Sequence, residues 1–180
     1  MTELDLRLFH WLNGVAIHPW LDWLMPIVTR RTTWGVFLGA GALYLLMTRG
    51  IRGRQVVLSL VLALALGDFG AAQILKPAFH RLRPCHAPVA ARVLGSCGGR
   101  HGFPSNHATN AASATAVLGI YYPATLAVTI PCAMLVGWSR IYLGVHYPGD
   151  VAAGFLLGGC LGSLVASAVG GKFVRRLPDN

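Results

Sequence analysis

The chain has 180 residues, of which 54% are hydrophobic and only 12% are charged. This balance excludes an ordinary soluble domain of the same length and is typical of a bundle of membrane helices. The formal net charge of +9 favours anionic membrane surfaces or phosphorylated substrates as partners, and the sequence has no nucleic-acid-binding motif that would favour nucleic acid.

Residues 1–31 are predicted to form two short amphipathic helices that lie on the bilayer surface. Leu4, Leu8 and Trp11 fall on one helical face, and polar residues fall on the other. The alternative is a further membrane span through residues 8–29. Tryptophan prefers the membrane interface, and four of the five tryptophans lie in or just after this segment, at Trp11, Trp20, Trp23 and Trp34.

Five later stretches are apolar and long enough to cross a hydrocarbon core of about 30 Å at a helical rise of about 1.5 Å per residue. We therefore expect an all-α integral membrane protein, a single domain over residues 1–180. It would have five transmembrane helices, or six if residues 8–29 also cross. The five stretches are 33–48, 55–75, 107–121, 124–142 and 149–170.

Two basic clusters predict the orientation of this bundle. With five spans, both clusters lie on the same side, which the positive-inside rule assigns to the cytoplasm. The 76–106 loop and the 143–148 turn then share the opposite side, which in a bacterial inner membrane faces the periplasm or the outside. The clusters are Arg49, Arg52 and Arg54 between the first two spans, and Lys172, Arg175 and Arg176 after the last.

On that opposite side, three groups of polar residues sit where apolar helices meet loops. Lys76, Arg83 and Arg140 supply fixed positive charge, and guanidinium groups match the oxygens of a phosphate. Ser105 precedes an apolar helix, so its hydroxyl and the free N–H groups of the helix start can hold an anion. Three further arginines of this side are interpreted as anchors at the membrane surface: Arg81, Arg92 and Arg100.

Two histidines in these groups can act on a bound phosphate. His107 lies within one turn of Ser105. Pro148 suits the first position of the last helix, which puts Asp150 in its first turn, from where the carboxylate can reach back to His146. Such a contact keeps one ring nitrogen of His146 protonated and leaves the other free to attack phosphorus.

The three groups together resemble the signature of the type 2 phosphatidic acid phosphatase (PAP2) superfamily. That signature has three motifs, in which x is any residue. The first is Lys-x6-Arg-Pro, the second is Pro-Ser-x-His, and the third is Ser-Arg-x5-His-x3-Asp. Here it runs from Lys76 to Asp150. The residue between Ser and His is usually Gly but is Asn106 in this chain. If the position contributes its backbone N–H to phosphate, asparagine should serve as well.

The resemblance implies a membrane lipid phosphatase that needs no cofactor and no metal. His146 would be the nucleophile, Asp150 would orient it, and His107 would protonate the leaving group and then activate water. Candidate substrates are undecaprenyl diphosphate, phosphatidic acid, phosphatidylglycerol phosphate and lipid A 1-phosphate. The phosphate-binding residues would be Lys76, Arg83, Ser105, Asn106 and Arg140.

Two other functions share parts of this pattern. A lipid phosphotransferase would form the same phosphohistidine and pass the phosphate to an alcohol. A non-catalytic or transporting membrane protein would carry polar residues through the middle of the bilayer, whereas here they gather at one end. Asp68, inside the second apolar stretch, is predicted to fix a donor near the site, the alternative being a neutral carboxyl group that packs between helices.

Cys85 and Cys97 are predicted to form a disulfide, because both lie in the same extramembrane segment between Arg83 and Ser105. Such a bond requires an oxidising compartment, which agrees with a periplasmic or outer location. One alternative is two free thiols in a mobile loop. Another is zinc binding with nearby histidines, although the spacing matches no standard zinc pattern. After Asp150, small residues recur every four positions and predict close helix packing: Gly154, Gly158, Gly162, Ala166 and Gly170.

Overall fold

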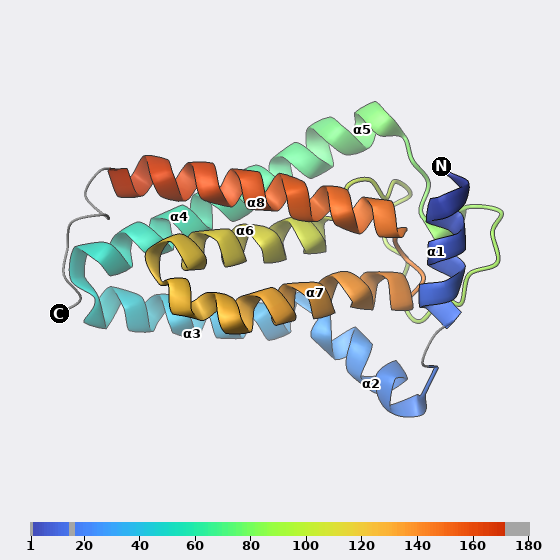
Figure 1. Ribbon diagram of the computed structural model, residues 1–180, viewed down its shortest axis with the longest axis horizontal. Helices are drawn as coiled ribbons and strands as arrows, with labels where there is room; N and C mark the ends of the chain where they lie inside the picture. The colour runs from blue at the N-terminus through green and yellow to red at the C-terminus, as the bar shows by residue number, and fades with distance from the viewer. Residues whose placement is uncertain (1, 15–16, 172–180) are drawn as a thin grey trace.

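The computed structural model describes residues 2–14 and 17–171 as a bundle of long helices with two short helices at one end (Figure 1). The C-terminal cluster of Lys172, Arg175 and Arg176 therefore lies outside the described residues. The helices in chain order are α1 (Glu3–Gly14), α2 (Pro19–Val28), α3 (Arg31–Thr48), α4 (Gly50–Phe69), the π-helix η1 (Gly70–Leu75), α5 (Lys76–Phe79), the 3-10 turn η2 (Pro84–His86), α6 (Asn106–Tyr121), the 3-10 turn η3 (Pro123–Thr125), α7 (Leu126–Tyr142) and α8 (Pro148–Gly170).

Three of the described helical segments are long and apolar enough to cross a membrane. They are Gly50–Phe79, Pro123–Tyr142 and Pro148–Gly170, and Thr32–Thr48 forms a shorter apolar helix. Large apolar side chains cover the outside of the bundle, as Leu156 at 72% exposure illustrates, and a lipid environment accounts for such a surface. The chain is thus an all-helical membrane protein, while five crossings remain a prediction.

The second apolar stretch extends further than the sequence predicted. Helix α4 continues through η1 into α5, so that Lys76 stands on a helix at the end of the bundle and not in the loop. The widened π turn comes just before Pro77, whose ring and missing N–H do not fit an ordinary α-turn. The helix ends at His80, which adopts a left-handed conformation with φ of 48°.

The N-terminal segment forms two separate helices and not one helix through residues 8–29. Helix α1 lies across the end of the bundle (Figure 1). Phe9 and Asn13 of α1 are buried, whereas Leu8 and Trp11 are exposed on its outer face. Asn13 fixes the helix in place, because its side-chain amide donates to the carbonyl oxygens of Ile141 and Tyr142 at the end of α7.

Helices α6 and α8 form the centre of the bundle because glycines on α8 let the two backbones approach closely. A side chain at Gly158 would come within 2.0 Å of the Thr109 carbonyl oxygen, and one at Gly154 within 2.7 Å of the Ser105 carbonyl oxygen. The close approach holds the start of α6 against the start of α8, where the Ser105 N–H donates to the Asp150 carbonyl at 3.0 Å. The small-residue repeat therefore aligns two of the predicted polar groups.

Candidate active site

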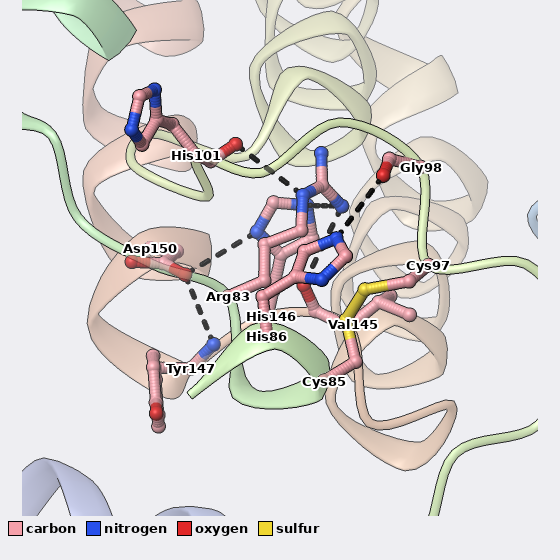
Figure 2. Close-up of a disulfide and its surroundings, with 10 residues drawn as sticks. All are labelled: Arg83, Cys85, His86, Cys97, Gly98, His101, Val145, His146, Tyr147 and Asp150. Atoms are coloured by element: carbon pink, nitrogen blue, oxygen red, sulfur yellow. Dashed lines mark hydrogen bonds and ion pairs between the residues drawn. A yellow bond between two sulfur atoms is a disulfide. The ribbon is translucent and has the colours of Figure 1, made fainter. Parts of the chain in front are cut away.

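The turn between α7 and α8 presents a buried histidine that is paired with a buried carboxylate (Figure 2). His146 Nδ1 lies 3.3 Å from Asp150 Oδ2, and the same oxygen accepts a hydrogen bond from the Tyr147 backbone N–H at 3.1 Å. Pro148 begins α8, which places Asp150 in the first turn and directs its carboxylate back over the turn. The contact at Nδ1 leaves His146 Nε2 as the nitrogen that can react.

Cations surround the reactive side of this histidine. Arg83 Nη1 lies 3.1 Å from His146 Nε2, and the Arg83 Nε–H donates to the His101 carbonyl at 3.3 Å (Figure 2). Burial lowers the pKa of His146 well below its usual value, and the charges of Arg83, Arg140 and Lys76 lower it further. His146 is therefore a neutral imidazole at neutral pH, which is the form that acts as a nucleophile.

The start of α6 provides donors for an anion. Ser105 stands just before the first residue of α6 and is completely buried. Its hydroxyl oxygen has no hydrogen-bond partner among the described residues. A buried hydroxyl normally has a partner, so an orphan hydroxyl beside free helix N–H groups indicates a place for a phosphate oxygen.

The Asn106 side chain takes part in a polar chain, whereas the sequence led us to expect only a backbone contribution. Lys76 Nζ donates to Asn106 Oδ1 at 2.5 Å and to the Pro104 carbonyl at 2.7 Å. Asn106 Nδ2 in turn donates to Asp68 Oδ1 at 2.8 Å, and Asn110 Nδ2 donates to the same oxygen at 3.2 Å. Asp68 is thus connected to Lys76 through the Asn106 side chain.

Thr29, at the end of α2, contacts two predicted site residues and was not found from the sequence. Its carbonyl oxygen lies 3.1 Å from His107 Nε2, and its hydroxyl accepts from Arg140 Nη1 at 2.6 Å. These contacts depend on how α2 docks against the bundle, and no local pattern around Thr29 signals them. His107 and Arg140 are therefore held by the N-terminal segment.

Two cavities of different chemistry meet at Asn106 and His107. The polar cavity, about 370 Å³, is lined by both of these residues and by His146, with Lys76 and Arg83 supplying positive charge. The apolar cavity, about 400 Å³, opens between α3, α4, α6 and α7. Apart from a few polar groups, its walls are mostly small or apolar side chains such as Leu38, Leu64, Ala111, Leu118, Ala133 and Val136.

Two of the three arginines that were interpreted as membrane anchors have acidic partners instead. Arg81 pairs with Asp5 and with Asp150, the latter at 3.0 Å, and Arg92 pairs with Asp22 at 2.5 Å. The anchor interpretation was wrong for both, because α1 and α2 bring carboxylates to this end of the bundle. Arg100, by contrast, is exposed and lies at the lining of the polar cavity.

The loop between α5 and α6 is closed by a disulfide. Cys85 and Cys97 are bonded, with their Cα atoms 6.2 Å apart (Figure 2). The only group among the described residues with the arrangement of a metal site consists of these two cysteines and His86. Because the sulfurs are bonded to each other, they are not available as the thiolates that zinc requires. The disulfide lies close to Arg83 and restrains the loop to which Arg83 belongs.

Comparisons with known proteins place the chain in one family. The family model described as "PAP2 superfamily" matches residues 55–173. This chain belongs to the PAP2 superfamily. One PAP2 relative, the lipid A 4'-phosphatase of Bacteroides thetaiotaomicron, is 34% identical over 88% of this chain and 74% of its own length. The undecaprenyl-diphosphatase of Sulfolobus acidocaldarius is 31% identical over 86% of this chain and 73% of its own length.

Solved structures of PAP2 proteins share the fold. The crystal structure of Aquifex aeolicus LpxE superposes with a TM-score of 0.73 at 27% identity, covering 91% of this chain and 95% of that one. The transmembrane PAP2-type phosphatidylglycerolphosphate phosphatase of Bacillus subtilis superposes with a TM-score of 0.64 at 26% identity, covering 96% and 90%. The helical bundle is thus that of membrane PAP2 proteins.

Proposed function

We propose that this protein is a membrane lipid phosphatase that works through a phosphohistidine at His146. One observation carries the proposal: the His146–Asp150 pair faces a cationic cavity that adjoins an apolar cavity. The cationic cavity suits a phosphate, and the apolar cavity suits the hydrocarbon attached to it. A transporting protein would need polar residues through the bilayer, whereas the charged residues of this site gather at one end of the bundle.

In the first step, His146 Nε2 forms a bond to phosphorus while the bond from phosphorus to the lipid oxygen breaks. Asp150 holds the Nδ1 proton and stabilises the positive charge that develops on the ring. His107, where the two cavities meet, donates a proton to the departing lipid oxygen. Lys76, Arg83 and the Ser105 hydroxyl stabilise the equatorial phosphoryl oxygens, and Arg140 adds its charge.

In the second step, water attacks phosphorus and the bond from nitrogen to phosphorus breaks. His107, deprotonated by the first step, takes the proton of the attacking water. Inorganic phosphate leaves, and His146 returns to its neutral form. The electrophilic assistance in both steps comes from the cationic side chains of the cavity, so we expect no metal requirement.

The substrate class follows from the apolar cavity and from the names of the relatives. Phosphatases of lipid A, undecaprenyl diphosphate and phosphatidylglycerol phosphate are among the similar proteins. All are named for membrane lipids that carry a phosphate or diphosphate. We propose the same class for this chain, namely a phosphomonoester or pyrophosphate head group on a lipid.

A panel of such lipids tests the proposal directly. The purified protein should release inorganic phosphate from at least one of undecaprenyl diphosphate, phosphatidic acid, phosphatidylglycerol phosphate and lipid A 1-phosphate. EDTA should leave the rate unchanged. If EDTA abolishes release and a divalent cation restores it, the metal-free scheme is wrong. Loss of substrate together with the appearance of a phosphorylated alcohol would instead identify a phosphotransferase.

We further propose that the site faces the periplasm or the outside of a bacterial inner membrane. Arg49, Arg52 and Arg54 lie at the α3–α4 corner, at the opposite end of the bundle from the site (Figure 1). The disulfide at the site end supports an oxidising compartment. Intact-mass measurement after alkylation, with and without reductant, should show two additional reactive thiols after reduction. Full alkylation without reductant would remove the main support for this orientation.

A further inference from the structure

The two oxygens of the Asp150 carboxylate have different partners. Oδ2 faces the catalytic side, where it contacts His146 Nδ1 and the Tyr147 N–H. Oδ1 faces away from it, and Arg81 Nη1 lies 3.0 Å from this oxygen. Asp150 is completely buried, so its charge needs a partner that solvent cannot supply. Arg81 provides that partner from the loop after α5.

Helix α1 holds Arg81 in this position. The second terminal nitrogen of Arg81, Nη2, pairs with Asp5 Oδ2, while Asp5 Oδ1 accepts from the Gly149 N–H at 2.8 Å in the first turn of α8. The side chains of Asp5 and Arg81 are only 11% and 20% exposed, which protects the pair from screening by salt. The carboxylate of Asp5 therefore joins α1, the α5–α6 loop and the start of α8.

An aromatic contact supports the same arrangement. The Arg81 guanidinium lies over the Tyr147 ring, 4.6 Å from its centre. The Tyr147 and Phe9 rings pack edge to face, with their centres 5.2 Å apart. Phe9 and Tyr147 are both buried. Helix α1 thus touches the neighbours of the catalytic pair through an ion pair, a backbone hydrogen bond and an aromatic contact, while its apolar outer face is exposed.

We propose that Asp5 and Arg81 are positioning residues, through which the N-terminal helix keeps Asp150 directed at His146. The inference rests on the proposed role of His146. Asp5 engages one terminal nitrogen of Arg81, so that only the other nitrogen reaches Asp150. Without Asp5, Arg81 would be free to draw the Asp150 carboxylate toward itself with both nitrogens. Without Arg81, a buried carboxylate would lose the charge that keeps it ionised. After either change, Asp150 stabilises less well the positive charge that develops on the His146 ring during its attack on phosphorus.

The test uses the full-length protein with phosphatidic acid as substrate and inorganic phosphate as a competitive inhibitor that reports binding without bond formation. Outer partners of metal-binding side chains typically contribute about 10- to 100-fold, and we expect losses of similar size in kcat for Arg81→Gln and Asp5→Asn. KM and the inhibition constant of inorganic phosphate should stay within about twofold of the wild-type values, because neither side chain lines the polar cavity. Asp5→Glu should recover part of the lost kcat, since it restores the charge.

Glu3→Gln is the matched control, because Glu3 pairs with Arg7 on the same helix with side chains 77% and 76% exposed. It should leave kcat unchanged. A wild-type kcat in Asp5→Asn overturns the inference, as does an equal loss of kcat and of phosphate binding with no recovery in Asp5→Glu. If Arg81→Gln does not fold, the two Asp5 variants still decide. Full activity of His146→Ala would instead refute the proposed function itself.

Discussion

The two cavities of this protein share Asn106 and His107 but differ in the rest of their lining. Cationic side chains dominate one, and small or apolar side chains dominate the other. In the polar cavity, specific partners hold two of the charged groups: the His101 carbonyl holds Arg83, and Asn106 holds Lys76. The apolar cavity is lined mostly by small and apolar side chains, with a minority of polar groups among them. The difference indicates that the phosphate must be held in one geometry, whereas the hydrocarbon needs only room. The boundary between them, at His107, is where we place the bond that breaks.

The largest effect is expected when the proposed nucleophile of the polar cavity is removed. His146→Ala should lose at least about 10⁴-fold in kcat, because the nucleophile cannot be replaced by water in the same place. The loss should be equal for a long-chain lipid phosphate and for water-soluble p-nitrophenyl phosphate. His10→Ala, an exposed histidine on α1, is the matched control and should behave as wild type. Residual activity of more than about one percent in His146→Ala would place the nucleophile elsewhere.

A smaller effect should separate the two cavities. Ala111→Leu fills part of the apolar cavity and should raise KM for a long-chain lipid phosphate about tenfold, equivalent to about 1.4 kcal/mol. The kinetics with p-nitrophenyl phosphate should not change, since this substrate has no chain to place. Leu156→Phe, on the exposed outer face of α8, controls for added bulk in the bundle. If Ala111→Leu impairs both substrates equally, the cavities are not functionally distinct.

Much of the polar cavity could be predicted from the sequence, because its residues follow fixed spacings at helix ends. The start of α6 at Asn106 and the reach of Asp150 back to His146 both come from local helix geometry. Asp5, Asp22 and Thr29 could not be found in this way. Their roles depend on how α1 and α2 dock against residues more than 60 positions away, as the Asp5–Arg81 pair with a separation of 76 residues illustrates. The count of five spans also stays a prediction.

The role of Asn106 is where sequence and structure lead to different expectations. The sequence alone predicts that Asn106→Gly is nearly neutral, since only a backbone N–H is needed. Because the side chain joins Lys76 to Asp68, we now expect a loss of about fivefold to tenfold in kcat/KM, near 1 kcal/mol for lost hydrogen bonds. Asp68→Ala should lose a similar amount, and the double variant should lose little more than either single one. Fully additive losses would contradict a shared chain.

The smallest effect concerns acid stability. The pKa of His146 lies well below about 6.5 in the folded protein, so below that pH the unfolded chain takes up a proton that the folded one does not. The contribution of neutral His146 to the free energy of unfolding is therefore fully present at pH 7 and decreases as the pH falls below about 6.5. The thermal midpoint of His146→Asn should fall less between pH 7 and pH 5 than that of the wild type, by a few degrees. Equal falls would indicate that His146 is already protonated when folded.

The central claim is the covalent intermediate, and the most direct measurement is the intact mass of the His107→Ala variant quenched during turnover of p-nitrophenyl phosphate. The p-nitrophenolate of this substrate leaves without taking up a proton, so the first step does not need His107. The second step still needs His107 to activate water, so the intermediate should accumulate in the variant. The account predicts a burst of p-nitrophenol, a mass increase of one phosphoryl group and an acid-labile label on the peptide that contains His146. A burst with no label, or a label on any other residue, would contradict it.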